Sequence, residues 1–520
     1  MKKNTYVWLV VSMVAPILSA CGDGGDKNTA STRLVATDPA KACQNISTAF
    51  KMDATTVNAA TYVAAGFRPP GSTSAIAQPF CRLEVTSKPS ADSDIKSEVW
   101  MPALDAWNGR FLAVGAGGNS GSIQYLAMSS GLAEGYAVLS TDNGHQGNDQ
   151  IFAVGHPEKV IDFGHRAQAV TAVSGKALTH EFYQESAKKS YWLGCSQGGG
   201  KGMMQSQRYP ENFDGIVAGS PVFDWVGSQF AAPWVAVKGM RDPAALVPRA
   251  KLSVIRQAVI AACDGKDGLT DGLIQQPERC NFNPATLACA GGTDTNACLT
   301  PGQVATMQRY YSPVTRPDGR QIYAAYPFGS EGGSPWLGST SPGGNWAGFW
   351  PNVVFENPTY SVVASLNVDT DTDYNFAKAK LASHYDAVST DLTAFKSRGG
   401  KLLIWHGYDD GAVSAYHTRD YVESVTARYG QETNGFMRAF FAPNVSHCGG
   451  SDGPQLDQMK LLATMVDWVE KGAAPASVIA TKSVNNVIER TMPVCPYPQV
   501  AKYKGAGEVK DAANFICVTS

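Results

Sequence analysis

The sequence lacks the patterns that mark several large classes of binding protein. Its 11 cysteines include no C-x-x-C pair, which argues against a zinc-thiolate site. Its 43 basic and 45 acidic residues nearly balance, and no basic run indicates a nucleic-acid partner. Beyond the N-terminus, no segment is long and apolar enough to span a bilayer. What is present instead, including 52 glycines and abundant aromatic residues, suits a globular, loop-rich enzyme.

The N-terminus predicts export and lipid anchoring. Lys2 and Lys3 precede a short apolar stretch, and residues 18–21 read LSAC, the pattern of a bacterial lipobox ending in Cys21. We therefore expect a lipoprotein signal peptide at 1–20, lipid on Cys21 and a flexible tether at 21–40. Gly22 rather than aspartate follows the cysteine, which favours the outer membrane, and the anchor would be the only membrane contact. An ordinary signal peptide with a chance cysteine is the alternative.

The other ten cysteines form an even set. In an exported protein, an even number favours disulfides over metal thiolates. Parity alone does not give the connectivity. The ten are Cys43, Cys81, Cys195, Cys263, Cys280, Cys289, Cys298, Cys448, Cys495 and Cys517.

Strands and helices alternate on both sides of a long irregular block. Residues 167–183 have the apolar spacing of a helix. Alternating elements of this kind predict a largely parallel sheet. The block at 222–388 is instead rich in Trp, Pro, Gly and Cys. We therefore predict an α/β fold in which residues 41–221 and 389–520 form the catalytic domain and residues 222–388 an inserted lid domain. The predicted strands lie at 98–102, 110–115, 136–140, 190–194, 213–219 and 401–407.

A nucleophile elbow is predicted at Ser196. Residues 194–198 read GCSQG, which fits G-x-S-x-G, and they lie between a predicted strand and a predicted helix. That geometry exposes the serine hydroxyl above the sheet. The N–H of Gln197 is then one oxyanion donor, and the glycine-rich loop at 115–121 offers Gly117 and Gly118 as candidates for the second. An ordinary glycine-rich turn is the alternative for the elbow. A phosphate-binding loop is the alternative for residues 115–121, but this segment has neither the Lys-Ser/Thr ending of a P-loop nor the G-x-G-x-x-G pattern.

The acid and the base are expected to follow the nucleophile, as in the α/β-hydrolase fold. Residues 406–410 read HGYDD directly after a strand, and the spacing H-G-x-x-D selects Asp410, with Asp409 as the alternative. His447 follows a late strand at 437–441 and lies in a glycine-rich turn. We therefore predict a Ser196–His447–Asp410 triad, in which the acid orients and stabilises the imidazole.

One adjacency connects the elbow to the base. Cys195 precedes Ser196, and Cys448 follows His447. If the serine and the histidine hydrogen-bond, the two cysteines must come close together. A Cys195–Cys448 disulfide is therefore predicted.

These motifs resemble the tannase and feruloyl esterase family, which also contains the hydrolase of mono(2-hydroxyethyl) terephthalate. The resemblance rests on the cysteine-flanked serine and histidine, on Asp410 and on an Asp-rich loop, and it covers nearly all of residues 43–517. It implies a serine carboxylic ester hydrolase that cleaves small esters of feruloyl or galloyl type through an acyl-enzyme. Pairing of nearest cysteines in chain order, which the resemblance supports, gives Cys43–Cys81, Cys263–Cys280, Cys289–Cys298 and Cys495–Cys517.

The Asp-rich loop predicts a structural calcium ion. Residues 264–273 read DGKDGLTDGL, with three carboxylates in eight residues and a spacing unlike that of an EF-hand. The family resemblance implies calcium here. Carried over by position, its ligands are the side chains of Asp264, Asp267 and Asp271 and the carbonyl oxygens of Leu269 and Leu273. A solvated acidic turn is the alternative.

The acyl group of the substrate is less sharply defined. A lid arginine would hold the substrate carboxylate in the terephthalate branch, yet no Lys or Arg lies between Arg320 and Lys378, and Gln197 replaces the acidic residue of that branch. A neutral aromatic ester is therefore favoured over a terephthalate monoester. The sequence also allows an acyltransferase on the same triad or a non-catalytic lipid-anchored binding protein, and it does not indicate the oligomeric state. Lid aromatics could line the site or simply pack: Trp336, Trp346, Phe349, Trp350 and Phe355.

Overall fold

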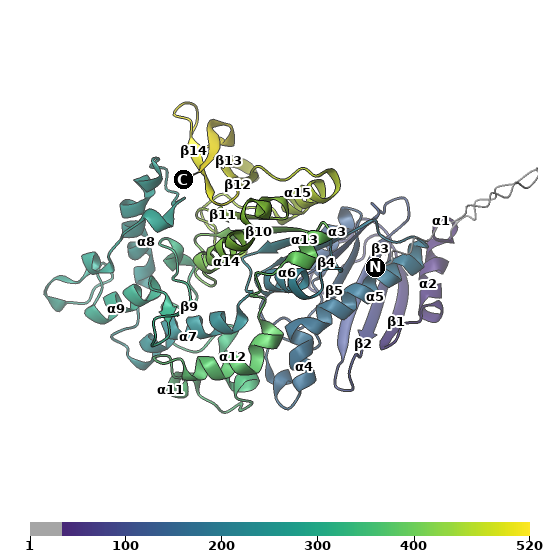
Figure 1. Cartoon of the computed structure of the whole chain (residues 1–520), viewed down its shortest axis with the longest axis horizontal. Coiled ribbons are helices and arrows are strands. Elements are labelled where there is room, and N and C mark those ends of the chain that lie inside the picture. The colour runs from purple at the N-terminus through teal and green to yellow at the C-terminus, as the bar shows by residue number, and fades with distance from the viewer. Residues whose placement is uncertain (1–33, 520) are drawn as a thin grey trace, which may run out of the picture.

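A nine-stranded sheet organises the computed structural model, which describes residues 34–519 (Figure 1). Its strand order is β1-β2-β3-β5-β4-β6-β7-β10-β11. Pairing is antiparallel from β1 to β5 and parallel from β5 to β11, so the predicted parallel part is preceded by an antiparallel edge. The strands are β1 (Thr55–Val63), β2 (Phe80–Ser87), β3 (Ile95–Pro102), β4 (Arg110–Val114), β5 (Ala137–Thr141), β6 (Lys189–Cys195), β7 (Gly215–Gly219), β10 (Lys401–Gly407) and β11 (Met437–Ala442).

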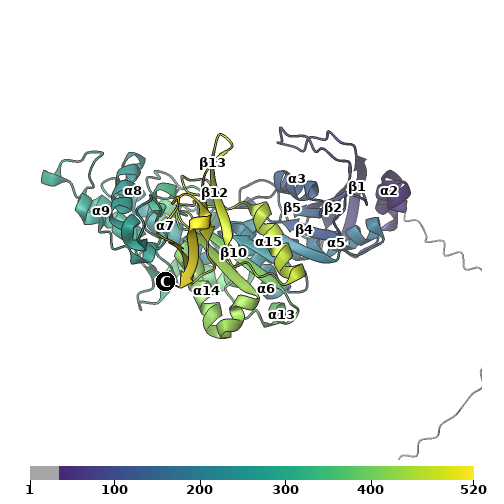
Figure 2. The same ribbon diagram turned by 90° about the horizontal axis from the view of Figure 1, so that it is seen from above.

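Both faces of the sheet are covered because alternate residues of each strand point to opposite sides. In β4, Phe111 and Ala113 belong to one buried apolar cluster, and Leu112 and Val114 belong to another. The first cluster packs under α5 (Ala167–Tyr183), α6 (Gln197–Arg208), α13 (Thr393–Ser397) and α14 (Ala415–Tyr429). The second packs under α3 (Tyr125–Ala133) and α15 (Gln458–Lys471). Figure 2 shows α3 and α6 on opposite sides of β4.

The end of the predicted flexible tether is helical in the structure. Residues 1–33, with Cys21 and the predicted signal peptide, lie outside the described residues. Within the predicted tether, α1 (Leu34–Thr37) and the start of α2 (Pro39–Ala49) are helical. Val35 is buried in the same apolar cluster as β4, which explains why this part of the tether is folded onto the domain.

Within the described chain, residues 222–388 contribute no strand to the large sheet. They form mainly helices around two apolar clusters, at the end of the molecule away from β1 and β2 (Figure 1). A short hairpin, β8 (Val314–Thr315) with β9 (Gln321–Tyr323), lies among them. The helices are α7 (Trp225–Arg241), α8 (Arg249–Cys263), α9 (Pro301–Tyr310), α10 (Trp346–Gly348), α11 (Val362–Ser365) and α12 (Thr372–Tyr385); α4 (Pro157–Ile161) precedes the segment.

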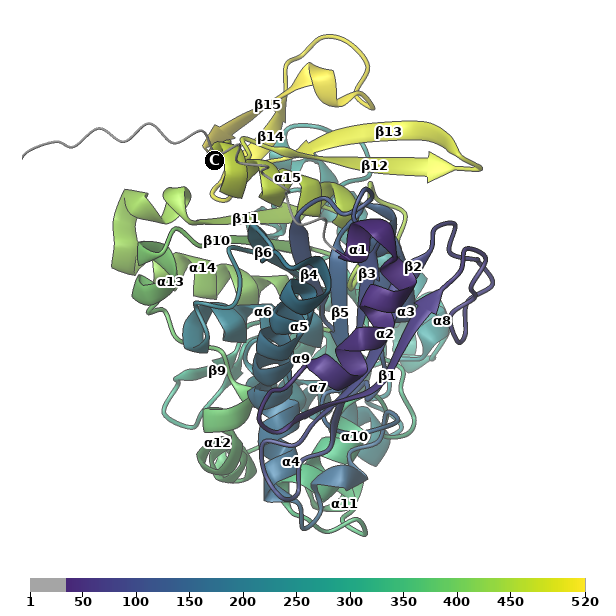
Figure 3. The same ribbon diagram turned by 90° about the vertical axis from the view of Figure 1, so that its right-hand side faces the viewer.

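The C-terminus forms two small antiparallel sheets that the strand patterns did not predict. β12 (Val478–Val484) pairs with β13 (Val487–Val494), and β14 (Gln499–Tyr503) pairs with β15 (Phe515–Thr519). Figure 3 shows both pairs above β11 and α15. None of the helices in residues 34–519 has the length and apolar character needed to cross a membrane.

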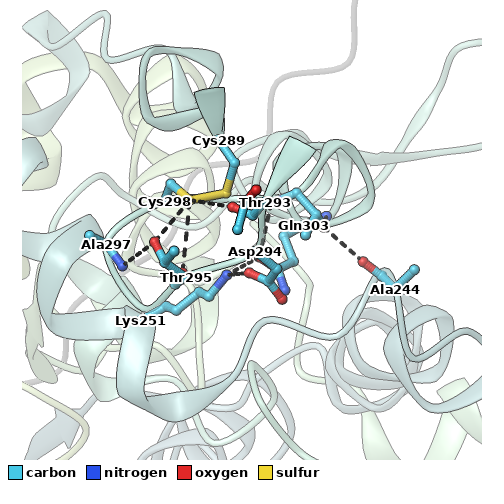
Figure 4. The surroundings of a disulfide bond; sticks show 10 residues. Ala244, Lys251, Cys289, Thr293, Asp294, Thr295, Ala297, Cys298 and Gln303 are labelled. Atoms are coloured by element: carbon cyan, nitrogen blue, oxygen red, sulfur yellow. Dashed lines mark hydrogen bonds and ion pairs between the residues drawn. A yellow bond between two sulfur atoms is a disulfide. The ribbon is translucent and has the colours of Figure 1, made fainter. Parts of the chain in front are cut away.

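Five disulfides join all ten cysteines of the described chain. Four are local, Cys43–Cys81, Cys263–Cys280, Cys289–Cys298 and Cys495–Cys517, and the fifth is Cys195–Cys448. These are the expected pairs. At the Cys289–Cys298 bridge, Lys251 reaches into the closed loop and forms an ion pair with Asp294 (Figure 4).

Candidate active site

Ser196 lies at a sharp turn between β6 and α6. Its backbone has φ of 61° and ψ of −124°, a conformation that a non-glycine residue adopts only where the surroundings hold it. The turn is crowded, since a Cβ on Gly198 would lie 2.8 Å from the carbonyl carbon of Gly115. Glycine at 198 therefore lets the elbow and the 115–121 loop approach each other.

His447 connects Ser196 to Asp410. Its Nδ1 lies 2.7 Å from Oδ2 of Asp410, and its Nε2 lies 2.8 Å from Oγ of Ser196. Because a carboxylate only accepts hydrogen bonds, Nδ1 carries the proton, and in the neutral ring Nε2 accepts from the serine hydroxyl. The neighbouring Cys195–Cys448 bridge has a Cα–Cα distance of 5.9 Å across a sequence separation of 253 residues. The structure thus brings together the three residues expected from chain order.

The charges at this site favour a basic imidazole. Burial raises the pKa of Asp410, but His447 and His406 outweigh that effect and hold it well below its ordinary range. Burial lowers the pKa of His447, but the charge and the hydrogen bond of Asp410 outweigh burial and raise it above its ordinary value. The carboxylate therefore stays ionised and stabilises the protonated histidine.

Asp410 is held by contacts that the sequence did not reveal. Its Oδ1 accepts the N–H groups of Ala412 at 2.9 Å and Val413 at 2.8 Å. The buried His406 contacts Oδ2 of Asp410 through Nε2 at 3.0 Å. The motif H-G-x-x-D places that histidine four residues before the acid and was the available signal. Asp409, the alternative acid, instead pairs with Arg256.

The 115–121 loop lies beside Ser196, as expected of an oxyanion loop. A Cβ on Gly117 would lie 3.9 Å from Cβ of Ser196, and Gly117 and Gly118 both line the pocket around the serine. Gln197 is the first residue of α6, where backbone N–H groups have no acceptor within the helix. His145 contacts the carbonyl oxygen of Asn119 through Nε2 at 2.9 Å and so supports this loop.

A pocket of about 510 Å³ opens at Ser196 and His447. The lid contributes Trp336 and Asn345 to its wall, and the loop that follows Asp410 contributes Ala412 and Val413. Among the described residues that line it, none is Asp, Glu, Lys or Arg. The other predicted lid aromatics, Trp346, Phe349, Trp350 and Phe355, pack in or against an apolar cluster of the lid. The wall of the pocket is therefore uncharged apart from the histidine.

Comparison with known proteins decides the family. The sequence model described as tannase and feruloyl esterase matches residues 81–518. The chain belongs to the tannase and feruloyl esterase family. It is 36% identical to an uncharacterized esterase of Xanthomonas campestris pv. campestris, over 91% of this chain and 90% of that protein. It is 34% identical to the mono(2-hydroxyethyl) terephthalate hydrolase of Piscinibacter sakaiensis, over 82% of this chain and 81% of that protein.

A solved structure supports the same assignment. Feruloyl esterase B from Aspergillus oryzae superposes with a TM-score of 0.85 at 30% identity, covering 92% of this chain and all of that chain. The chain is therefore an esterase of the tannase and feruloyl esterase type with an α/β-hydrolase fold, as the sequence motifs predicted.

The Asp-rich loop at residues 264–273 is compact and partly buried. Asp264 accepts the N–H groups of Asp271 and Gly272, and Asp267 accepts those of Leu269 and Gln275. Burial, with smaller contributions from the nearby Asp271 and Asp264, raises the pKa of Asp267 to about 6. In residues 34–519, no three His, Cys, Asp or Glu side chains already converge in an arrangement that could hold a metal. The predicted calcium site stays a prediction.

Proposed function

We propose that this esterase cleaves esters of aromatic acids, of feruloyl or galloyl type, through a Ser196–His447–Asp410 triad. The observation that carries the proposal is the imidazole of His447, which contacts the hydroxyl of Ser196 and the carboxylate of Asp410. Ser196 and His447 line a pocket together with Trp336. Ser196 attacks the ester carbonyl while His447 takes its proton, and His447 then returns that proton to the leaving alcohol. Water, activated by His447, hydrolyses the acyl-enzyme.

The oxyanion that forms during attack needs preorganised donors. The N–H of Gln197, at the start of α6, and an N–H of Gly117 or Gly118 are the proposed donors. Their support is position: Gln197 directly follows the nucleophile, and the two glycines line the pocket beside it. The partial positive charge of the α6 N-terminus adds to the stabilisation.

The uncharged pocket wall favours neutral esters. A substrate carboxylate would be desolvated there without a cationic partner, which is costly. The second candidate, a mono(2-hydroxyethyl) terephthalate-type activity, draws support from the 34% identical relative of that name. The pocket offers no Lys or Arg to a substrate carboxylate, so we place the neutral aromatic ester first.

A matched substrate panel tests this choice. We expect kcat/KM for the methyl esters of ferulate, gallate and benzoate to exceed that for a terephthalate monoester by roughly tenfold or more. The reason is the cost of desolvating the monoester carboxylate, and tenfold corresponds to about 1.4 kcal/mol of that cost. The neutral terephthalate diester is the control, because it has the same ring without the charge. A monoester rate equal to or above that of the diester would reverse the order of the two candidates.

We further propose that the Asp-rich loop binds a structural calcium ion. Its donor chemistry fits: hard oxygens come from the side chains of Asp264, Asp267 and Asp271, with the carbonyls of Leu269 and Leu273 completing the set. The mutual repulsion of these carboxylates, which helps raise the pKa of Asp267, is what a divalent cation would relieve. The side chain of Asn444 donates to the carbonyl oxygen of Gly272 at 2.8 Å, so the loop also supports the turn that carries His447.

Calcium removal should therefore destabilise the protein. An ion bound only to the native state adds stability by mass action, on the order of 3–4 kcal/mol at saturating calcium, and each kcal/mol lost lowers the Tm of a chain this long by about 1 °C. We expect excess chelator to lower the Tm by several degrees and added calcium to restore it, with magnesium as the control. An unchanged melting curve, with no calcium found by elemental analysis, would remove the site.

The lipid anchor is also a proposal. The lipobox pattern LSAC, preceded by basic and apolar residues, supports diacylation of Cys21, and the following Gly22 supports an outer-membrane location. Mass spectrometry of the N-terminal peptide from the membrane fraction tests it, and an unmodified Cys21 in soluble protein would contradict it.

A further inference from the structure

An ion pair between a partly buried arginine and a buried carboxylate joins the lid to the loop that carries Asp410. Nη1 of Arg256, in α8, lies 2.6 Å from Oδ2 of Asp409 and also donates to the carbonyl oxygen of Gly329 at 2.5 Å. Asp409 is only 3% exposed. Because Asp409 directly precedes Asp410, a lid side chain acts on the residue next to the proposed catalytic acid.

The lid backbone also packs tightly against the loop that contains both aspartates. A Cβ on Gly411 would lie 2.4 Å from the nitrogen of Ser334. A Cβ on Gly333 would lie 2.7 Å from the carbonyl oxygen of Asp409. Such close packing leaves the loop little room to move while the lid stays in place.

Glu331 completes the charged cluster on the lid side. It is fully buried, and its Oε2 accepts from the hydroxyl of Tyr311 and from the N–H of Gly329, each at 2.9 Å. Burial raises the pKa of Glu331 to about 7 and that of Asp409 to about 6, and the guanidinium of Arg256 opposes both rises. The nearby negative charge of Asp452 also raises the pKa values of Asp409 and Arg256. The positive charge of Arg256 therefore pairs directly with Asp409 and also favours the ionised form of Glu331.

We propose that Arg256 is a positioning residue for the triad, whose ion pair with Asp409 holds Asp410 in line with Nδ1 of His447. The inference rests on the proposed function, since it is the triad that is positioned. Without the arginine, the carboxylate of Asp409 is left buried and unpaired, and the loop must shift or the group must take up a proton. A displacement of about 1 Å at a catalytic group can cost roughly a hundredfold in rate.

The test compares Arg256→Met with Arg256→Lys and with Arg316→Met. Arg316 forms another lid ion pair, 3.3 Å from Asp371; its side chain is about as exposed as that of Arg256, and it does not line the pocket. For each variant, kcat, KM, the Tm and the pH dependence of kcat/KM are measured on a neutral aromatic ester. Arg256→Met should lower kcat by about 10- to 100-fold with little change in KM. Arg256→Lys should recover part of the loss, and Arg316→Met should keep the wild-type kcat.

The pH profile distinguishes positioning from simple stabilisation. Asp410 raises the pKa of His447, so a poorly placed Asp410 lets that pKa fall. Because the free base is the active form, the acid limb of kcat/KM should move to lower pH in Arg256→Met. A variant with a lower Tm but an unchanged kcat and acid limb would show that the ion pair is structural only.

A second variant keeps the inference testable if Arg256→Met does not fold. Asp409→Asn keeps the shape of the side chain, removes its charge and replaces one acceptor oxygen with an NH2 group. It should move the acid limb in the same direction by a smaller amount. An unmoved acid limb in that variant overturns the inference. Wild-type protein that hydrolyses no ester would overturn the proposed function instead, so the two failures can be told apart.

Discussion

Ser196→Ala is expected to lower kcat on aromatic esters by about 10⁴- to 10⁶-fold while the fold and the pocket persist. The change removes the hydroxyl that lies 2.8 Å from Nε2 of His447 and leaves the imidazole without a nucleophile to activate. Steady-state turnover, together with mass spectrometry after treatment with an organophosphonate, measures the loss, since the variant should take up no label.

Ser228→Ala is the matched control for this prediction. Ser228 lines the same pocket, but its hydroxyl donates to the carbonyl oxygen of Trp225 at 2.8 Å and takes no part in the triad. It should keep most of the turnover and be labelled normally at Ser196. Residual activity of Ser196→Ala above a few per cent of the wild type would show that Ser196 is not the nucleophile.

Asp410→Asn should lower kcat by about 10⁴-fold, since an amide cannot hold the histidine in the tautomer that accepts a proton from serine. It also removes the charge that raises the pKa of His447. Asp409→Asn should cost far less, roughly tenfold, because Asp409 pairs with Arg256 and does not contact the imidazole. Turnover of both variants at matched temperature, with the Tm of each, measures the difference. A greater loss for Asp409→Asn would mean that the acid is misassigned.

Local sequence determined the elements and residues whose signals are short-range. Helix α5 spans Ala167–Tyr183 as its apolar spacing predicted, and β10 spans Lys401–Gly407. Ser196 was predicted at a strand–helix turn because the elbow is a contiguous motif, and it lies between β6 and α6. His447 was predicted beside it from chain order and the adjacent Cys448, and its Nε2 lies 2.8 Å from Oγ of Ser196. The antiparallel strands β1 and β2 and the C-terminal sheets were not predicted from the sequence. In β12 and β13 the missed signal was local, because these strands form a hairpin whose turn residues, Asn485 and Asn486, both have positive φ.

Only the tertiary structure decided how the site is held. The sequence left Asp409 and Asp410 as competitors, because both follow the same strand and differ by one position. Folding separates them: one carboxylate points to His447 and the other to Arg256. Likewise, Trp336 reaches the pocket while Trp346 and Trp350 are buried in the lid. The physical reason is that side-chain direction depends on contacts between residues far apart in the chain, which no local pattern specifies.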